Sequence, residues 1–338
     1  MGTKRIVVIP GDGIGPEITQ VALSVLEALD CGLGFEMALA GLAAQEAGRG
    51  LMPGETIDLI GELGVALKGP LTTPIGRGFT SLNVDLRRRF DLYANLRPAQ
   101  SYPGTSSCFK NVDILTVREN TEGLYAGVGD KLMEDGERAE SVAVITKKGS
   151  NRVLRFAYEL ACRRKRHRIA VVHKANILKA TSGLFLDCSR EIRQDYPEIE
   201  TRELIVDNAC MQLVLDPDQF DIIVTTNLFG DIISDICAGL IGGLGMAPGA
   251  NIGDEAAIFE AVHGSAPDIA GQGIANPAAL ILAAAMMLDH LDLDDEATRV
   301  RSAVRAAIES HDRCTPDLGG SGSTQEFAQA IIDHLSRV

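Results

Sequence analysis

The chain of 338 residues combines two hydrophobic patterns, one typical of buried strands and one typical of amphipathic helices. The first apolar run, 5–9, leads into a glycine-rich turn, after which Ile18, Val21 and Val25 recur at helical spacing. Comparable apolar runs predict strands over 35–40, 65–67, 113–117, 141–145, 168–173, 201–206, 221–226 and 257–262. Helical spacing predicts one helix that begins at Pro16 and others over 151–164, 182–196, 230–240, 277–290, 297–310 and 324–337.

Strands that alternate with helices along the whole chain indicate an α/β protein. The length favours two domains with large cores, and the hydrophobic content of 46% indicates a globular chain. No repeat, low-complexity tract or linker marks a domain boundary. The longest apolar stretch, 278–288, is too short to span a bilayer, and the N-terminal apolar run is too short for a signal peptide.

The glycine cluster after the first predicted strand does not fit a Rossmann dinucleotide site. The G-x-G-x-x-G pattern that begins at Gly11 needs a third glycine at position 16, where the chain has Pro16. No acidic residue ends an obvious second strand to hold a ribose. We therefore interpret Gly11, Gly13 and Gly15 as a tight strand-to-helix turn.

A basic segment lies within an otherwise acidic chain. Seven Lys or Arg residues and three Asp residues lie between positions 77 and 118, a local net charge of +4 (7 − 3), whereas the chain as a whole carries −14. Arginine pairs bidentately with carboxylate or phosphate, so the segment predicts an anionic ligand. Arg87, Arg88 and Arg89 are adjacent on a predicted helix and point in different directions, so one or two of them face solvent. Arg97 and Arg118 each end an apolar, strand-like run.

Acidic residues suggest a cation site in the second half of the chain. Asp231 and Asp235 are four residues apart, so a helix that begins near Gly230 would place both on one face. Oxygen ligands without Cys or His favour Mg²⁺ or Mn²⁺ over Zn²⁺. The simpler alternative is a helix-capping aspartate beside a surface aspartate. Asp207 and Lys174 each end a further apolar run. Ligands of α/β proteins bind at the carboxyl ends of such strands.

Composition limits the partners and the compartment. A pI near 4.9 argues against nucleic acid and anionic membranes as partners. The seven cysteines are scattered and form no C-x-x-C pair, which favours free thiols in a reducing cytoplasm.

Longer motifs resemble the β-decarboxylating dehydrogenases that act on isocitrate, homoisocitrate or 3-isopropylmalate. The resemblance runs from 9–17 to 315–320, and its strongest parts are 227–235, 249–254 and 263–271. It implies the isocitrate/isopropylmalate dehydrogenase-like fold, which has two α/β domains and is not a Rossmann fold. It also implies a discontinuous large domain, 1–92 with 242–338, a small domain, 93–241, that carries a dimer-forming segment, and a homodimer or larger assembly.

The resemblance also implies roles for individual residues. Tyr125 and Lys174 are expected to be catalytic, with Tyr125 as the acid that protonates carbon and Lys174 as the group that assists proton removal from the substrate hydroxyl. Lys174 and Asp207 resemble residues that cross to the neighbouring subunit. The implied metal ligands are Asp207, Asp231 and Asp235, and the implied substrate-binding residues are Ser81, Asn83, Arg87, Arg97 and Arg118.

Substrate and cofactor follow from two short segments of the resemblance. Ser81-Leu-Asn83-Val-Asp-Leu-Arg87 has the isocitrate form, whereas isopropylmalate enzymes have an apolar patch there. Asp268 and Ile269 occupy the place of the Lys-Tyr pair of NADP-using relatives, which implies NAD, as do Pro316 and Gly320. The implied cofactor-binding residues are Thr73, His263, Gly264, Ser265, Ala266, Asp268, Ile269 and Asn276.

The expected activity is therefore NAD-dependent oxidative decarboxylation of D-isocitrate, as in the tricarboxylic acid cycle, with Mg²⁺ or Mn²⁺. Homoisocitrate and then 3-isopropylmalate remain alternative substrates. A non-catalytic regulatory subunit of a heteromeric isocitrate dehydrogenase is the alternative from another class. Such subunits lose arginine or metal-ligand positions that this chain retains.

Overall fold

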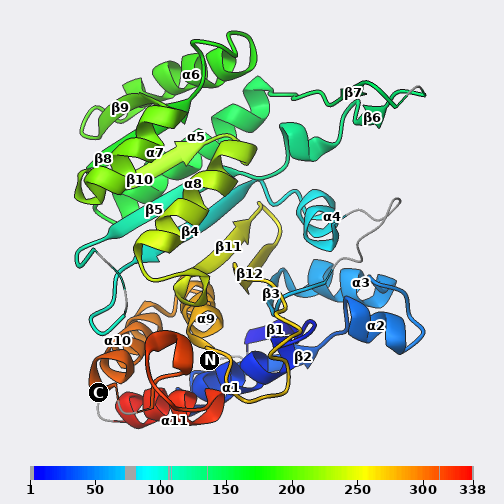
Figure 1. Ribbon diagram of the computed structural model, residues 1–338, viewed down its shortest axis with the longest axis vertical. Helices are drawn as coiled ribbons and strands as arrows, with labels where there is room; N and C mark the ends of the chain where they lie inside the picture. Colours follow the sequence, from blue (N-terminus) through cyan, green and yellow to red (C-terminus); the bar gives the residue numbers. More distant parts are fainter. Residues whose placement is uncertain are drawn as a thin grey trace. The chain divides into compact units, whose positions relative to one another are not determined.

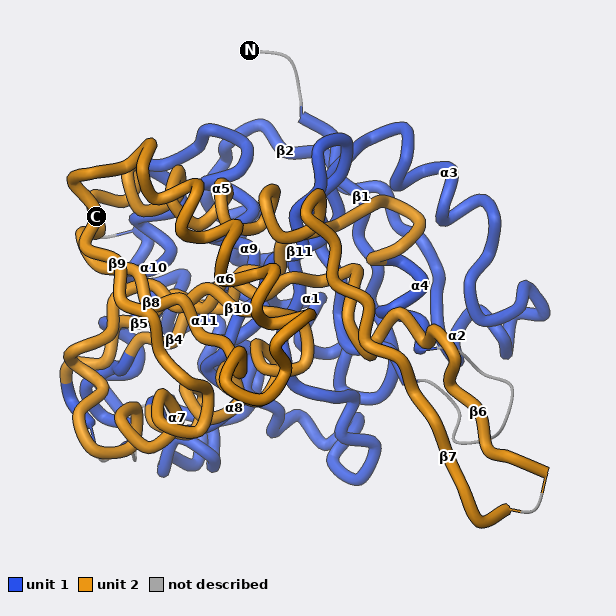
Figure 2. The backbone as a smooth tube through the Cα atoms, turned by 90° about the horizontal axis from the view of Figure 1, so that it is seen from above, with its two compact units in different colours: residues 1–86, 101–110, 241–338 blue, residues 87–100, 111–240 orange. Residues whose placement is uncertain are grey.

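The protein divides into two compact units, coloured separately in Figure 2. The computed structural model describes residues 4–72, 81–105, 107, 109–134, 136–311 and 313–336. Unit 1 comprises 1–86, 101–110 and 241–338, and unit 2 comprises 87–100 and 111–240. The expected domain bounds differ from the units in three places: 87–92 belongs to unit 2, and 101–110 and residue 241 belong to unit 1. Segment 101–110 is held within unit 1 by the Arg305 guanidinium, which lies 5.0 Å from the centre of the Tyr102 ring.

Unit 1 is built on five strands in the order β2-β1-β3-β12-β11. All neighbours in it are parallel except β11 and β12, which are antiparallel. The strands are β1 (Lys4–Ile9), β2 (Leu33–Met37), β3 (Val65–Lys68), β11 (Pro248–Ile252) and β12 (Ala257–Ala261).

The central helix of unit 1 is α9 (Ala278–His290), which is buried over nearly its whole length and packs on β3, β11 and β12. Its mostly apolar sequence fits this position, since a helix that is hydrophobic all round has no polar face for solvent. Helices α10 and α1 pack against it, and α11 packs on both of them (Figure 1). The other helices of this unit are α1 (Gly15–Ala28), α2 (Leu42–Glu46), α3 (Gly54–Leu63), α10 (Asp294–Ser310) and α11 (Thr324–Leu335), with short 3₁₀ turns η4 (Leu244–Met246) and η5 (Pro316–Leu318).

Unit 2 is built on five strands in the order β4-β5-β10-β8-β9. Only β4 and β5 are antiparallel, so the carboxyl ends of β5, β10, β8 and β9 share one edge. The strands are β4 (Ala94–Gln100), β5 (Asp113–Glu119), β8 (Arg168–His173), β9 (Glu200–Ile205) and β10 (Ile222–Thr225), and β6 (Lys131–Leu132) pairs separately with β7 (Ala139–Glu140).

Helices of unit 2 pack in two pairs. Helix α5 packs with α6, and α7 packs with α8, which also lies along β5 (Figure 1). The helices are α5 (Lys147–Arg163), α6 (Thr181–Ile192), α7 (Val206–Leu215) and α8 (Asn227–Leu240), with 3₁₀ turns η1 (Leu124–Ala126), η2 (Arg193–Asp195) and η3 (Pro217–Gln219). Helix α4 (Leu82–Arg89) contains the point at which the chain passes from unit 1 to unit 2.

Several elements differ from the sequence prediction. The predicted strand 141–145 is absent, and Val144 forms only an isolated bridge with Gly123. Strand β11 was missed because its Pro-Gly start is unfavourable for a strand, and its pairing with β12 supplies what the local sequence lacks. Helices α2, α3 and α7 were also missed, and α8 begins at Asn227 rather than near Gly230.

The glycine turn after β1 has the conformation that its sequence suggested. Gly11 and Gly13 have φ of +79° and +60°, and Gly15 is the first residue of α1. A Cβ on Gly13 would lie 2.0 Å from the Ser265 carbonyl oxygen, so that position tolerates no side chain. Within the described ranges, no helix is long and apolar enough to cross a membrane.

Candidate active site

Two neighbouring parallel strands of unit 2 bring the candidate residues together. Thr225, at the end of β10, is in register with Arg118 near the end of β5. Helix α8 begins two residues after Thr225, so its first turns lie beside Arg118. Asn227, Asp231 and Ser234 follow at helical spacing and form a polar face on a largely apolar helix.

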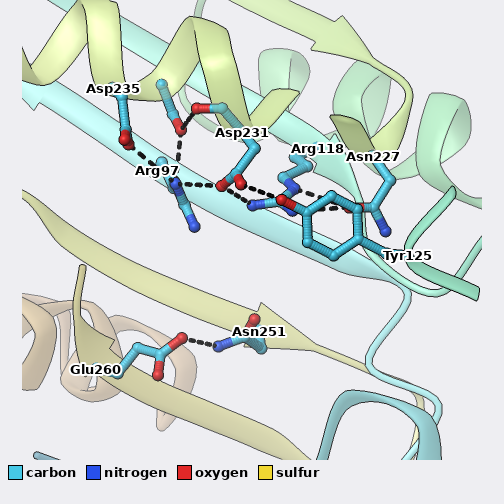
Figure 3. Close-up of polar contacts among 9 residues, drawn as sticks. Arg97, Arg118, Tyr125, Asn227, Asp231, Asp235, Asn251 and Glu260 are labelled. Atoms are coloured by element: carbon cyan, nitrogen blue, oxygen red, sulfur yellow. Dashed lines mark hydrogen bonds and ion pairs between the residues drawn. The ribbon is translucent and has the colours of Figure 1, made fainter. Parts of the chain in front are cut away.

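Asp231 is the centre of the site. Its carboxylate accepts a hydrogen bond from Tyr125 Oη at 2.5 Å and forms an ion pair with Arg118 Nη1 (Figure 3). Arg97 Nη1 lies 3.2 Å from Asp231 Oδ1 and 3.6 Å from Asp235 Oδ1. The structure thus joins two of the three expected metal ligands to two of the expected substrate-binding arginines.

The charges in this cluster are set by burial and by each other. Burial alone would raise the pKa of Asp231, but Arg118, the Tyr125 hydroxyl and Arg97 together lower it. Burial, followed by the neighbouring Arg97 and Arg87, lowers the pKa of Arg118 to about 10. Burial and the Asp231 carboxylate raise the pKa of Tyr125. At neutral pH the cluster therefore holds a carboxylate, a guanidinium and a protonated phenol.

The arginines lie differently from the sequence expectation. Arg97 does not end its strand but lies in the middle of β4, paired with Thr116 of β5. Arg118 lies one residue before the end of β5 and is 1% exposed. Arg87 is buried, whereas Arg88 is exposed and donates to the Tyr125 carbonyl oxygen at 2.7 Å. The adjacent arginines therefore have different surroundings, as their helical positions require.

Lys174 and Asp207 form a second, separate pair. His173 of β8 is in register with Ile205 of β9, so the residues that follow these strands meet at the same edge. Lys174 Nζ lies 2.5 Å from Asp207 Oδ1, and this contact lowers the pKa of the exposed Asp207. Asp207 lies in the first turn of α7, not at the end of a strand as predicted.

The expected metal ligands do not all meet in one chain. Asp231 and Asp235 are one turn apart on α8 and supply the hard oxygen donors that Mg²⁺ and Mn²⁺ prefer. Within the part of the chain that the structure describes, no group of three His, Cys, Asp or Glu residues is close enough to hold a metal ion. The two carboxylates fit such a site chemically but do not complete it within the described residues.

Helix α4 carries the residues expected to read the substrate. Ser81 immediately precedes the helix, and its carbonyl oxygen accepts the backbone N–H of Asp85 at 2.9 Å. Asn83 and Arg87 are four residues apart and therefore lie on the same side of α4. The Asn83 side-chain oxygen is buried without a hydrogen-bond partner among the described residues, which leaves it for a ligand.

In unit 1, the loop after β12 contains the residues expected to hold the cofactor. His263 Nδ1 lies 3.0 Å from the Gly264 carbonyl oxygen, and burial lowers the pKa of His263. Its Nε2 is buried and has no partner among the described residues. A neutral imidazole with Nδ1 donating to Gly264 therefore presents Nε2 as an acceptor.

The rest of this loop is fixed mainly by backbone contacts. Ser265 Oγ lies 2.7 Å from Thr72 Oγ1, and its carbonyl oxygen accepts the Ile14 N–H at 2.9 Å. Ala266 has a φ of +37° and accepts the Ile269 N–H, and no helix begins at the exposed Asp268. Asp268 therefore does not cap a helix in this loop.

The last expected cofactor residue, Asn276, is already engaged. It donates to Asp317 Oδ2 at 2.9 Å and accepts the Ala278 N–H at 2.9 Å. Thr73 lies outside the described residues.

Two residues of the site, Ser234 and Asn227, were not predicted from the sequence. Arg97 Nη1 donates to Ser234 Oγ at 2.6 Å, and Arg118 donates twice to Asn227. The available signal was spacing, because Asn227 and Ser234 are four residues before and three residues after Asp231 and so share its helical face. This spacing identifies one face only if the helix includes Asn227, and the sequence predicted a start near Gly230.

Comparison with known proteins identifies the class to which this site belongs. A family described as isocitrate/isopropylmalate dehydrogenase matches residues 5–331, so the chain belongs to this family of dehydrogenases. The mitochondrial isocitrate dehydrogenase [NAD] catalytic subunit 5 of Arabidopsis thaliana is 46% identical over 327 residues, which are 96% of this chain and 87% of the relative. The 3-isopropylmalate dehydrogenase of Archaeoglobus fulgidus is 47% identical over 332 residues, 98% of this chain and 99% of the relative.

The fold is confirmed by a solved structure. A crystal structure of isocitrate dehydrogenase from Methylococcus capsulatus superposes with a TM-score of 0.94 at 51% identity, covering 99% of each chain. The protein thus has the α/β fold of isocitrate and isopropylmalate dehydrogenases, as the sequence motifs predicted, and not a Rossmann fold.

Proposed function

We propose that the protein is an NAD-dependent isocitrate dehydrogenase that converts D-isocitrate to 2-oxoglutarate and CO₂ with Mg²⁺ or Mn²⁺. The observation that carries this proposal is the cluster in which Arg97, Arg118 and Tyr125 converge on Asp231. Buried guanidinium groups bind carboxylates, and a phenol whose pKa is raised remains available as a proton donor. The names of the isocitrate dehydrogenase relatives support this reading.

Each residue has a distinct role in the proposed reaction. Arg97 and Arg118 hold substrate carboxylates, and Tyr125 delivers a proton to the carbon that loses CO₂. Lys174 of the partner subunit assists removal of the proton from the substrate hydroxyl. Asp231 and Asp235, with Asp207 of the partner subunit, would hold a divalent cation, which would polarise substrate oxygens as a Lewis acid.

The substrate is the first point to test. Ser81 and Asn83 precede Arg87 by six and four residues, and a hydroxyl and an amide are suited to the extra carboxylate of isocitrate. We expect a higher kcat/KM for D-isocitrate than for homoisocitrate or 3-isopropylmalate, measured as NADH formation. Ser81→Ala with Asn83→Leu is expected to reduce kcat/KM for isocitrate by about tenfold or more, because a buried carboxylate loses its partners. A higher kcat/KM for homoisocitrate or 3-isopropylmalate than for D-isocitrate in the unmodified protein would show that isocitrate is not the preferred substrate.

Two alternative functions have support of their own. The Archaeoglobus relative is named as a 3-isopropylmalate dehydrogenase, which keeps that substrate as a competing choice. Homoisocitrate remains a prediction from the sequence motifs. A regulatory subunit would show no turnover alone. The retained Arg97, Arg118, Tyr125 and Asp231, with their mutual contacts, favour a catalytic chain.

Preference for NAD is the second point to test. The Asp268 side chain is exposed and makes no hydrogen bond within the described part of the chain, so it is available to accept from ribose hydroxyls. The same carboxylate would repel a 2′-phosphate of charge about −2. We expect kcat/KM to favour NAD⁺ over NADP⁺ by at least about tenfold, since one charged hydrogen bond contributes about 1.5–3 kcal/mol. Asp268→Lys with Ile269→Tyr should narrow or invert this ratio. Equal values in the unmodified protein would exclude this role of Asp268.

Self-association belongs to the same proposal. Helices α7 and α8 pack together and expose apolar side chains, including Leu215 at 71%, Val214 at 56% and Ile232 at 48%. Exposed apolar groups in one region are typical of an interaction surface. They support a homodimer in which each site takes Lys174 and Asp207 from its neighbour. A cytoplasmic location remains a prediction from the cysteine pattern.

A further inference from the structure

The buried guanidinium of Arg118 is held by an uncharged acceptor. Asn227 Oδ1 accepts hydrogen bonds from Arg118 Nε at 3.1 Å and from Nη2 at 2.7 Å. Both side chains are about 1% exposed, so water does not compete for these bonds. The fork is fixed on two of its three nitrogens, and Nη1 is directed to Asp231 (Figure 3).

Helix α8 is shaped to let the Arg118 stem pass close to it. A Cβ placed on Gly230 would lie 2.5 Å from Arg118 Cγ and 2.7 Å from Arg118 Cβ. Asn227 and Gly230 are three residues apart, so the hydrogen-bond acceptor and the position without a side chain are neighbours on one helical face. Together they form a cradle that fixes the direction of the guanidinium.

The neutrality of Asn227 has an electrostatic consequence. Arg118 is buried and already forms one ion pair, with Asp231. A carboxylate in place of the Asn227 amide would have nearly the same shape and would add a second negative charge beside the guanidinium. It would also cancel much of the positive potential that an anionic substrate meets at Nη1.

We propose that Asn227 is a positioning residue that orients Arg118 without adding a second negative charge beside the Asp231 carboxylate, and thereby sets the affinity of the site for a substrate carboxylate. This inference rests on the proposed function of Arg118 as a carboxylate-binding residue. It assigns to Asn227 an electrostatic role in addition to a structural one. A purely structural residue would not change substrate affinity when only its charge is altered.

The test compares Asn227→Asp with Asn111→Asp, which adds the same charge at an exposed position of unit 2. D-malate, the core shared by the three candidate acids, serves as the probe in binding calorimetry, and D-isocitrate serves in kinetics. For Asn227→Asp we expect Kd and KM to rise at least about tenfold, with a thermal midpoint equal to or above that of the parent protein. Asn111→Asp should leave both constants within about twofold.

A second variant covers the case in which Asn227→Asp does not fold. Asn227→Ala removes the acceptor without adding charge, so two buried N–H groups lose their partner. We expect this variant to have a lower thermal midpoint and weaker D-malate binding. Unchanged D-malate affinity in either variant would overturn the inference. A parent protein that does not turn over isocitrate, together with variants that bind D-malate more weakly, would instead refute the proposed substrate and leave the role of Asn227 intact.

Discussion

Replacement of Asp231 by asparagine is expected to lower kcat/KM by about a hundred- to a thousandfold, the range found when one principal group that stabilises a transition state is removed. Asp231 contacts Arg97, Arg118 and Tyr125, and it is one of the two carboxylates of α8 offered to a divalent cation. Asparagine keeps the shape but loses the charge, so metal affinity should fall far more than stability. Chelation should abolish turnover of the unmodified protein, and Mg²⁺ or Mn²⁺ should restore it.

The measurements separate a metal role from a folding role. Mn²⁺ binding by calorimetry reports the metal directly, and the thermal midpoint reports folding. Asp218→Asn, an exposed change in the same unit, is the matched control and should affect neither. Full activity in excess chelator, or unchanged Mn²⁺ affinity in Asp231→Asn, would remove Asp231 from the metal site.

The structure adds a further reason for the size of this effect. In the structure, the arginines that are expected to bind substrate are paired with the aspartates that are expected to bind metal. The two charge types neutralise each other, which keeps a buried guanidinium from standing alone. Substrate and cation would each take over one partner of these pairs, so loss of Asp231 disturbs both binding events.

The sequence predicted those parts of the fold that have a strong local pattern. The buried strands β1 and β8 and the apolar helix α9 were placed within one or two residues, because each is determined by its own residues. Strand β11 was not predicted, because its Pro-Gly start disfavours a strand and its formation depends on pairing with β12. Helix α7 was missed as well.

The candidate site shows the same division. Charge type and strand ends identified Arg118, Asp231 and Lys174 as candidates from the sequence alone. The role of Asn227 was not accessible, because it depends on the register between β5 and β10, a contact between residues 109 positions apart. Parallel pairing leaves no local signal, so which polar residue of α8 faces which arginine required the structure.

The third expected metal ligand raises the question of subunit sharing. Asp207 pairs with Lys174 in the structure, and neither residue makes a hydrogen bond or ion pair with Tyr125 or Asp231 among the described residues. The Asp207 side chain is 70% exposed, which weakens its ion pair with the partly buried Lys174, so a neighbouring site can recruit both groups at small cost.

Mixing two inactive variants is therefore expected to restore activity. Lys174→Met and Tyr125→Phe each remove a proton-transferring group from the proposed reaction, so each protein alone should be nearly inactive. If the sites are shared, a hybrid dimer contains one site with both groups intact and one site with neither. Random reassembly of equal amounts should recover about one quarter of the parent activity, because about half of the dimers are hybrids and each has one complete site of two.

The experiment needs proof that subunits exchange. Chains with different affinity tags, denatured together and refolded, should co-purify through either tag, and the doubly tagged fraction should carry the recovered activity. Reassembly of each variant with itself is the control and should remain inactive. Doubly tagged dimers without activity would mean that Lys174 and Tyr125 act within one chain.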